Sequence, residues 1–202
     1  LAVVVYFKKD IFSFYKNKKL FYKILISSLP VMIVGYILIK LDLIYYLRSI
    51  RIIGWTTILF GVLLYYSDKF KDDKIINKDF SFKSALIIGA VQILSLIPGV
   101  SRSGITITAG RFLEFKREDA AKISFLLSIP TLAAVSFFGI NNLLNTESFN
   151  FSLINLIAIT LSFVFSFLTI KYFLKYISNF SLNIFVIYRI LLGFMILFLS
   201  YL

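Results

Sequence analysis

Apolar residues run through this chain in long blocks that short polar connections separate. A block of about 20 apolar residues is long enough to cross the hydrocarbon core of a bilayer as a helix. The sequence therefore predicts an all-α integral membrane protein, built as a multi-span helical bundle. The expected spans cover residues 20–39, 51–66, 120–140, 151–170 and 184–202, and residues 1–7 look like the end of another helix.

The block from Ser84 to Leu113 departs from this pattern, because Pro98-Gly99 interrupts it. A helix from Ser84 to that break rises only about 21 Å, whereas the hydrocarbon core is about 30 Å thick. The polar run Ser101–Gly104 would then lie at membrane depth, where irregular backbone is tolerated only if protein buries it or it lines a wet cavity. We predict a re-entrant helical hairpin over about residues 84–113, with a site at its tip.

Composition supports a membrane protein and assigns it an orientation. The 202 residues are 59% hydrophobic and carry a formal net charge of +12. Most basic residues fall in the connections at 8–19, 67–83, 114–119 and 171–183. This distribution predicts that these connections lie in the cytoplasm, and it explains the positive charge by membrane orientation and lipid headgroups instead of nucleic-acid binding. The hairpin would then enter and leave from the cytoplasmic side. Histidine and cysteine are absent, which removes the commonest general base and any disulfide or thiolate metal site.

Arg102 is the strongest candidate for chemistry, since an uncompensated arginine at the bilayer centre costs about 2.5–3.5 kcal/mol or more. Its guanidinium presents a fork of donors that suits phosphate oxygens. A helix beginning near Ser101 directs free N–H groups at the same turn. We predict an anion cradle for phosphate or pyrophosphate. Its proposed members are Arg102 and Ser101 as catalytic residues, with Ser103, Gly104, Thr106, Gln92 and Gly99 as ligands of the diphosphate.

Simpler explanations exist for several of these residues. Ser101 could serve only as a helix N-cap while Arg102 extends to water. Gln92 is as readily a packing amide as a ligand. A nucleotide-binding P-loop fails, because Ile105 stands where its lysine is required. Arg189 lies near the start of the last span, where extension of its side chain to the interface is the default explanation.

The run from Gly89 to Thr106, GAVQILSLIPGVSRSGIT, resembles the second signature of the bacitracin-resistance family of undecaprenyl-diphosphate phosphatases. The later segments REDAAKISFLLSIPTLAA and IYRILLG are similar to that family as well. The resemblance implies a hydrolase of undecaprenyl diphosphate in the bacterial inner membrane, which recycles the carrier lipid for peptidoglycan synthesis. It also implies an inverted-repeat fold with two re-entrant hairpins, and a divalent cation, Mg²⁺ or Ca²⁺.

The family's first signature, with paired glutamates, a serine-rich turn and a histidine, has no counterpart in this sequence. The chain opens with Leu1 inside an apolar run, and we expect that an upstream part of the protein carries that signature. Residues 1–202 would then form a single membrane domain that holds half of an active site, without metal ligands of its own, and that is inactive alone.

Two functions of other classes remain as alternatives. A transporter or flippase of an anionic lipid headgroup would use a midplane arginine and inverted hairpins equally well. A purely structural membrane subunit is the weaker alternative. The expected partners are a polyprenyl diphosphate lipid and the membrane, without nucleic acid, and a homodimer is left open.

Overall fold

The computed structural model describes residues 1–16, 18–43, 48–144 and 153–202, and over these residues the chain is built of helices. Five of these helices are long and apolar enough to cross a membrane, which confirms the predicted all-α membrane protein. They are α3 (Lys18–Lys40), α4 (Ile50–Asp68), α8 (Arg117–Leu144), α9 (Leu153–Asn179) and α10 (Asn183–Tyr201). The shorter helices are α1 (Ala2–Tyr6), α2 (Lys8–Lys16), α5 (Ile76–Asp79), α6 (Phe82–Gln92), the 3₁₀ turn η2 (Ile93–Leu96) and α7 (Arg102–Phe112).

Two of the predicted connections are wrong in detail. Residues 8–19 were expected to form a loop, but α2 occupies most of this segment and α3 begins at Lys18. Residues 171–183 were also expected to connect two spans, whereas α9 continues through them to Asn179. In both segments lysines flank short apolar and aromatic runs, and long lysine side chains can extend to water from a helix as readily as from a loop. The predicted span at 151–170 begins outside the described residues, which resume at Leu153.

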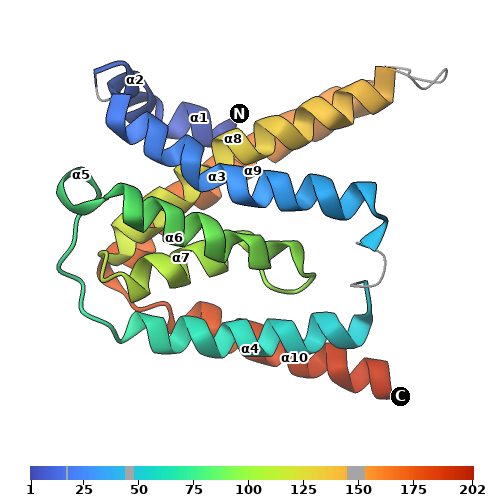
Figure 1. Ribbon diagram of the computed structural model, residues 1–202. Helices are drawn as coiled ribbons and strands as arrows, with labels where there is room; N and C mark the ends of the chain where they lie inside the picture. The colour runs from blue at the N-terminus through green and yellow to red at the C-terminus, as the bar shows by residue number, and fades with distance from the viewer. Residues whose placement is uncertain (17, 44–47, 145–152) are drawn as a thin grey trace.

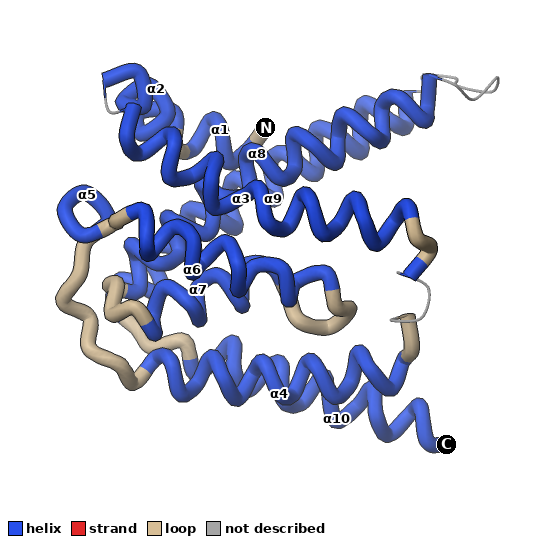
Figure 2. The backbone as a smooth tube through the Cα atoms, viewed as in Figure 1, coloured by secondary structure: helices blue, strands red, loops and turns tan. Residues whose placement is uncertain are grey.

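The block at 84–113 folds as a helical hairpin. Its incoming arm is α6 followed by η2, its outgoing arm is α7, and the loop between them contains Pro98 and Gly99. Figure 1 shows the hairpin as the middle layer, with α3 above it and α4 and α10 below it. In Figure 2 the tan tip loop of the hairpin lies at the opposite end from the loops around α5. The hairpin therefore enters the bundle from one end and stops inside it.

Close backbone contacts hold both arms of the hairpin. Arm α6 packs on α3, where a side chain at Gly89 would collide with the backbone of Ser27. The hydroxyl of Ser27 donates to the carbonyl of Ala85 at 2.8 Å. Arm α7 packs on α8, and a Cβ atom at Gly110 would lie 2.9 Å from that of Ala120. Small residues thus let the two arms approach the spans as closely as membrane helices commonly do.

Helices α4 and α10 pack along each other below the hairpin. Three glycines permit this contact. A Cβ atom at Gly54 would lie 2.6 Å from Leu197, one at Gly193 would lie 2.5 Å from Ile58, and one at Gly61 would lie 3.2 Å from the Cβ of Arg189. The close approach brings Arg189 of α10 against the hairpin tip.

One carboxylate, that of Asp68, joins the ends of several elements at the basic end of the bundle. Its side chain is 4% exposed. Arg117 at the start of α8 donates to it through Nε at 2.7 Å and Nη2 at 3.2 Å. The amide of Leu182, just before α10, donates at 3.1 Å. Arg111 near the end of α7 places Nε 3.6 Å from Oδ1. This junction fixes the outgoing arm of the hairpin to three spans.

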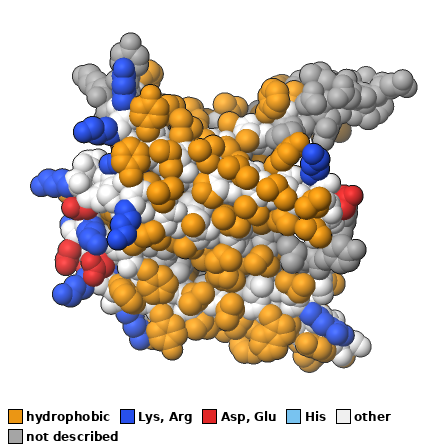
Figure 3. Space-filling model, in the orientation of Figure 1, with side chains coloured by type: hydrophobic (Ala, Val, Ile, Leu, Met, Phe, Trp, Pro, Cys, Tyr) orange, Lys and Arg blue, Asp and Glu red, His pale blue; other side chains and the backbone are white. Residues whose placement is uncertain are grey.

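The surface is consistent with insertion into a bilayer. Apolar side chains cover the middle of the face seen in Figure 3, and charged side chains gather at its two ends. The end that carries α2 and α5 shows more lysine and arginine than the opposite end in this view. That end is the one from which the hairpin enters, as the sequence predicts.

Candidate functional site

The tip of the hairpin has an unusual backbone. Gly99 has φ +90°, and Ser101 has φ +61° although it carries a side chain. A residue other than glycine held in this region costs about 1–3 kcal/mol, which surrounding contacts must offset. Ser101 then caps α7, because its hydroxyl accepts a hydrogen bond from the amide of Gly104 at 3.3 Å. The N-terminus of α7 is therefore presented at the tip, deep in the bundle.

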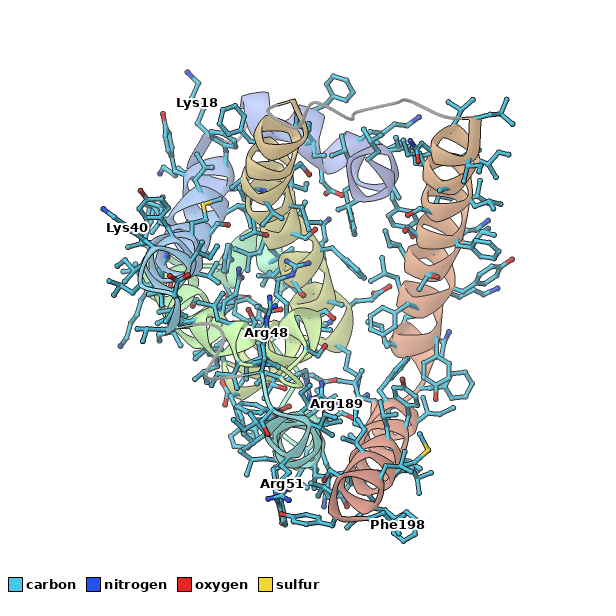
Figure 4. All side chains as sticks on the ribbon, turned by 90° about the vertical axis from the view of Figure 1, so that its right-hand side faces the viewer. Lys18, Lys40, Arg48, Arg51, Arg189 and Phe198 are labelled. Atoms are coloured by element: carbon cyan, nitrogen blue, oxygen red, sulfur yellow. The ribbon has the colours of Figure 1, made fainter. Side chains whose placement is uncertain are left out.

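Side chains from α4 and α10 hold this tip in place. The hydroxyl of Thr56 donates to the carbonyl of Pro98 at 2.6 Å. The guanidinium of Arg189 donates through Nη2 to the carbonyl of Gly99 at 2.9 Å. Figure 4 shows Arg189 between α10 and the hairpin. A side chain at Gly99 would collide with Thr56 and lie 2.6 Å from the carbonyl of Ile53, so the loop rests directly on α4.

Two cavities flank the first turn of α7. The first, which we call the Arg102 chamber, has a volume of about 630 Å³ and lies between α3, the hairpin and α8. Its polar lining consists of Gln92, Ser95, Arg102 and Thr131, with Tyr36 and Lys40 at the exposed end of α3. Its remaining walls are apolar. They are formed by Val31, Met32, Gly35, Ile39, Leu96, Leu132, Ala134 and Val135.

The Arg102 chamber contains buried polar atoms without partners. The side chain of Gln92 is fully buried, and neither its Nε2 nor its Oε1 has a hydrogen-bond partner among the described residues. Nη1 of Arg102 is likewise buried and unpaired there. Such groups cost about 1–3 kcal/mol each when unsatisfied, and more when charged. Their concentration in one cavity indicates that a ligand with polar atoms completes it.

The second cavity, which we call the Arg189 chamber, has a volume of about 500 Å³ and lies on the other side of the tip. The hairpin contributes Gly99, Ser101, Ser103 and Gly104 to its lining, and α10 contributes Arg189. Arg189 is 8% exposed and forms no ion pair with the described acidic residues. Its Nη1 would lie 2.9 Å from a Cβ atom at Gly104, so the missing side chain there admits the guanidinium. A second cation thus faces the same helix N-terminus.

The structure divides the residues that the sequence grouped into one cradle. Arg102 and Gln92 line the Arg102 chamber, whereas Gly99, Ser101, Ser103 and Gly104 line the Arg189 chamber. Thr106 lines neither cavity. Its buried hydroxyl bonds to the hydroxyl of Ser124 at 2.7 Å and donates to the carbonyl of Arg102 at 2.9 Å, which ties α7 to α8.

Two arginines matter more than the sequence indicates. Arg189, expected to extend to the interface, instead points to the hairpin tip, and the aligned glycines of α4 and α10 are the only sequence signal for it. Arg111 donates to the carbonyls of Phe115 and Phe70, each at 2.6 Å, at the foot of the hairpin. Burial lowers the pKa of its guanidinium from the ordinary value, while Asp68 acts in the opposite direction.

The lining of neither chamber fits a divalent cation. Mg²⁺ and Ca²⁺ take oxygen ligands, chiefly carboxylates, and the described lining residues include no carboxylate. Within the described residues, no group of three or more histidine, cysteine, aspartate or glutamate side chains could hold an ion. The metal requirement implied by the resemblance therefore stays a prediction.

The fold and the two chambers define a class. This is a multi-pass membrane protein whose helical hairpin brings a cationic side chain to an apolar-walled cavity inside the bundle. The chain belongs to the family described as Bacitracin resistance protein BacA, which matches residues 1–195.

Three relatives are each named undecaprenyl-diphosphatase. The protein of Pelagibacter ubique (strain HTCC1062) is 47% identical over 202 residues, covering the whole of this chain and 78% of the relative. That of Jannaschia sp. (strain CCS1) is 37% identical over 183 residues, covering 91% and 68%. That of Aliivibrio salmonicida (strain LFI1238) is 39% identical over 208 aligned positions, covering 95% and 76%.

Proposed function

We propose that this protein is a membrane diphosphatase, which hydrolyses undecaprenyl diphosphate to undecaprenyl phosphate and inorganic phosphate. The observation that carries the proposal is the buried, unpaired guanidinium nitrogen of Arg102 in an apolar-walled chamber. The names of the relatives support the reaction. A lipid diphosphate has the matching chemistry, since its headgroup needs cationic donors and its prenyl chain needs apolar walls.

The geometry suggests how the headgroup is held. Arg102 would bind diphosphate oxygens from the Arg102 chamber, and Arg189 would reach the same turn from the opposite side. In the reaction, the oxygen of water bonds to the terminal phosphorus as the P–O bond of the anhydride breaks. Charge then develops on the oxygens of the phosphoryl group and of the leaving phosphate. Cations fixed before the reaction stabilise that charge without reorganising.

Ser101 and Ser103 belong to the same proposal. Both line the Arg189 chamber at the N-terminus of α7. Ser101 already accepts a bond from the Gly104 amide, which leaves its hydroxyl hydrogen to donate to a phosphate oxygen. Gln92 would complete the headgroup contacts from the other chamber.

We place the protein in the bacterial inner membrane, where this reaction would return the carrier lipid to cell-wall synthesis. The five membrane-length helices support a multi-pass location. Hydrolysis of the lipid diphosphate to the lipid monophosphate would also oppose bacitracin, in line with the family description.

The test measures phosphate release from undecaprenyl diphosphate by the protein as its natural gene encodes it, in detergent micelles. Arg102→Ala should lower kcat/KM by about 10²–10³-fold, the loss seen when one preorganised electrostatic group is removed. Arg51→Ala is the matched control, because Arg51 packs on Tyr201 at the N-terminal end of α4 and lines neither chamber. Tight binding of the lipid without release of phosphate would reject hydrolysis and favour transport.

The expectation that residues 1–202 hold half of an active site is tested beside it. The 202-residue chain alone should bind the lipid diphosphate but release no phosphate. Turnover by this chain at a rate comparable with that of the natural gene product would contradict the half-site prediction.

A further inference from the structure

The Arg102 chamber has a feature that the binding of a simple anion does not explain. A fully deprotonated diphosphate carries only hydrogen-bond acceptors, so it pairs with donors alone. The chamber offers such donors in the Nη1 atom of Arg102 and the Nε2 atom of Gln92. It also contains acceptors, which such an anion would leave unpaired.

The first acceptor is Oε1 of Gln92. The side chain is fully buried and Oε1 has no partner among the described residues. Rotating the amide by 180° exchanges its oxygen and nitrogen but leaves one acceptor and one NH₂ group in the chamber. Gln92 therefore offers one acceptor to the chamber in either orientation of the amide.

The second acceptor is the hydroxyl of Thr131, on α8. It donates its single hydrogen to its own helix, with the carbonyl of Leu127 at 2.9 Å and that of Ser128 at 3.2 Å. The hydroxyl oxygen of Thr131 can therefore only accept a hydrogen bond from a ligand in the chamber. Ser95 can donate or accept, so it satisfies either kind of ligand atom.

We propose that the Arg102 chamber selects the diphosphate in its singly protonated form, with the P–OH group donating to Gln92 or Thr131 and the unprotonated oxygens accepting from Arg102. This inference rests on the proposed function and specifies the state of its substrate. Gln92 thereby becomes a residue that determines specificity.

The surroundings make the prediction testable by pH. The titratable side chains that line the chamber are Tyr36 and Lys40 from α3 and Arg102 from α7, and the described residues of α6, η2 and α8 contribute none. Tyrosine, lysine and arginine in small peptides titrate near pH 10 or above. The whole chain contains no histidine and no cysteine. No side chain that lines the chamber from these 202 residues therefore titrates between pH 5 and 8. In the 202-residue chain, a change in this range reports the ligand, whose phosphate has a second pKa of about 6.

The two explanations predict opposite signs. A cationic site that merely attracts an anion stabilises the deprotonated form, and so lowers the last pKa of the bound phosphate. A site with acceptors facing the phosphate stabilises the P–OH form and raises that pKa.

The experiment is a ³¹P NMR titration of a methylene-bridged farnesyl bisphosphonate, which cannot be hydrolysed, bound to the purified protein in metal-free buffer. We expect the last pKa of the bound ligand to lie at least one unit above that of the free ligand. In the double variant that combines Gln92→Met and Thr131→Val it should fall to the free value or below, and each single variant should lower it in part. Ser128→Ala is the matched control, since this buried hydroxyl on α8 bonds to the carbonyl of Phe125 and lies outside the chamber.

Each other result overturns a defined part. A bound pKa below that of the free ligand rejects the selection of the protonated form but leaves the diphosphatase intact. A raised pKa that persists in the double variant assigns the effect to the apolar walls and rejects the role of Gln92 and Thr131. Failure of the wild-type protein to bind the ligand both in metal-free buffer and with added Mg²⁺ or Ca²⁺ rejects the proposed function together with this inference. Thermal unfolding of each variant shows whether it is folded.

Discussion

Arg102 and Arg111 are two arginines on one helix with different roles. Arg102 lines a cavity and leaves Nη1 unpaired. Arg111 is 1% exposed and its Nε also lacks a hydrogen bond, but that atom lies 3.6 Å from Asp68 and the two Nη atoms donate to backbone carbonyls. Burying a charge without a partner costs free energy. Arg102 therefore lowers the stability of the folded protein, and its retention is understandable only through a ligand.

This contrast gives a prediction for stability. Arg102→Gln should leave the Tm in detergent micelles unchanged or raise it, because a desolvated charge is removed. Arg111→Gln should destabilise by about 3–5 kcal/mol, as expected when one partner of a buried charged network is lost. Thermal unfolding followed by circular dichroism compares the two variants. A loss of stability in Arg102→Gln equal to that in Arg111→Gln would assign Arg102 a structural role.

For single residues, the sequence predicted the identity of the site residues better than it predicted the directions of their side chains. It singled out Arg102, Ser101 and Gln92 from their polarity in an apolar frame. It could not show that they face two chambers, because Gln92 lies on the incoming arm and the path of the chain into α7 depends on the positive φ of Gly99 and Ser101. Arg189 was misjudged for a related reason. An arginine near a helix end has a local path to water, and only its contact with Gly99 excludes that explanation.

The hairpin is the element that positions the site, and its tip depends on one glycine. Gly99 combines φ +90° with direct contact to α4. Gly99→Ala should therefore lower stability by about 1–3 kcal/mol and displace Arg102 and Ser101, so that phosphate release falls with it. Thermal unfolding and the phosphate assay measure both effects.

Gly139 supplies the control for this substitution. A Cβ atom there meets nothing within 4 Å, and the residue lies inside α8. Gly139→Ala should be neutral or stabilising by about 0.5–1 kcal/mol. Equal behaviour of the two glycine variants would show that the tip adapts to a side chain.

The junction at the other end of the hairpin yields a second prediction at this scale. Asp68→Asn removes the charge shared by Arg117, Arg111 and the start of α10, so we expect a loss of about 3–5 kcal/mol. Glu114→Gln breaks the exposed pair with Lys74, whose side chains are 43% and 41% exposed, and should cost at most about 1 kcal/mol. Unfolding midpoints of the two variants test the difference.

The sequence located the hairpin because Pro98-Gly99 halts an apolar helix too soon to cross a bilayer. It did not reveal the helices over Lys8–Lys16 and at the end of α9, where lysines interrupt the apolar pattern. It also assigned no role to Asp68. A carboxylate at the boundary of a polar loop resembles any solvated residue until three elements converge on it.

For the whole molecule, the charge distribution predicts an orientation that labelling can test. These 202 residues contain no cysteine, so single cysteines introduced into the 202-residue chain react without a background. Lys71→Cys, between α4 and α5, should react with a membrane-impermeant maleimide only when the cytoplasmic face is exposed. Asp42→Cys, after α3, should react in intact cells. The reverse pattern would contradict the predicted orientation and would open the hairpin to the outer face.

The overall architecture was the most predictable property of this chain, because hydrophobic length alone defines the spans. The packing of α4 on α10 was not predictable in the same way. Gly54, Gly61 and Gly193 are spaced for close contact, but only the folded chain shows that they meet each other.

The spacing between Arg102 and Arg111 has a consequence for how this family can change. Nine residues of helix correspond to about 13 Å and two and a half turns, so the two guanidiniums leave α7 in opposite directions. Because Arg111 is held at the foot of the hairpin, the length of α7 sets both the depth of Arg102 in the bundle and the direction in which its side chain leaves the helix. One residue inserted or deleted between them would swing the upper guanidinium by about 100° and out of its cavity. The length of this interval is therefore fixed by the two contacts at its ends.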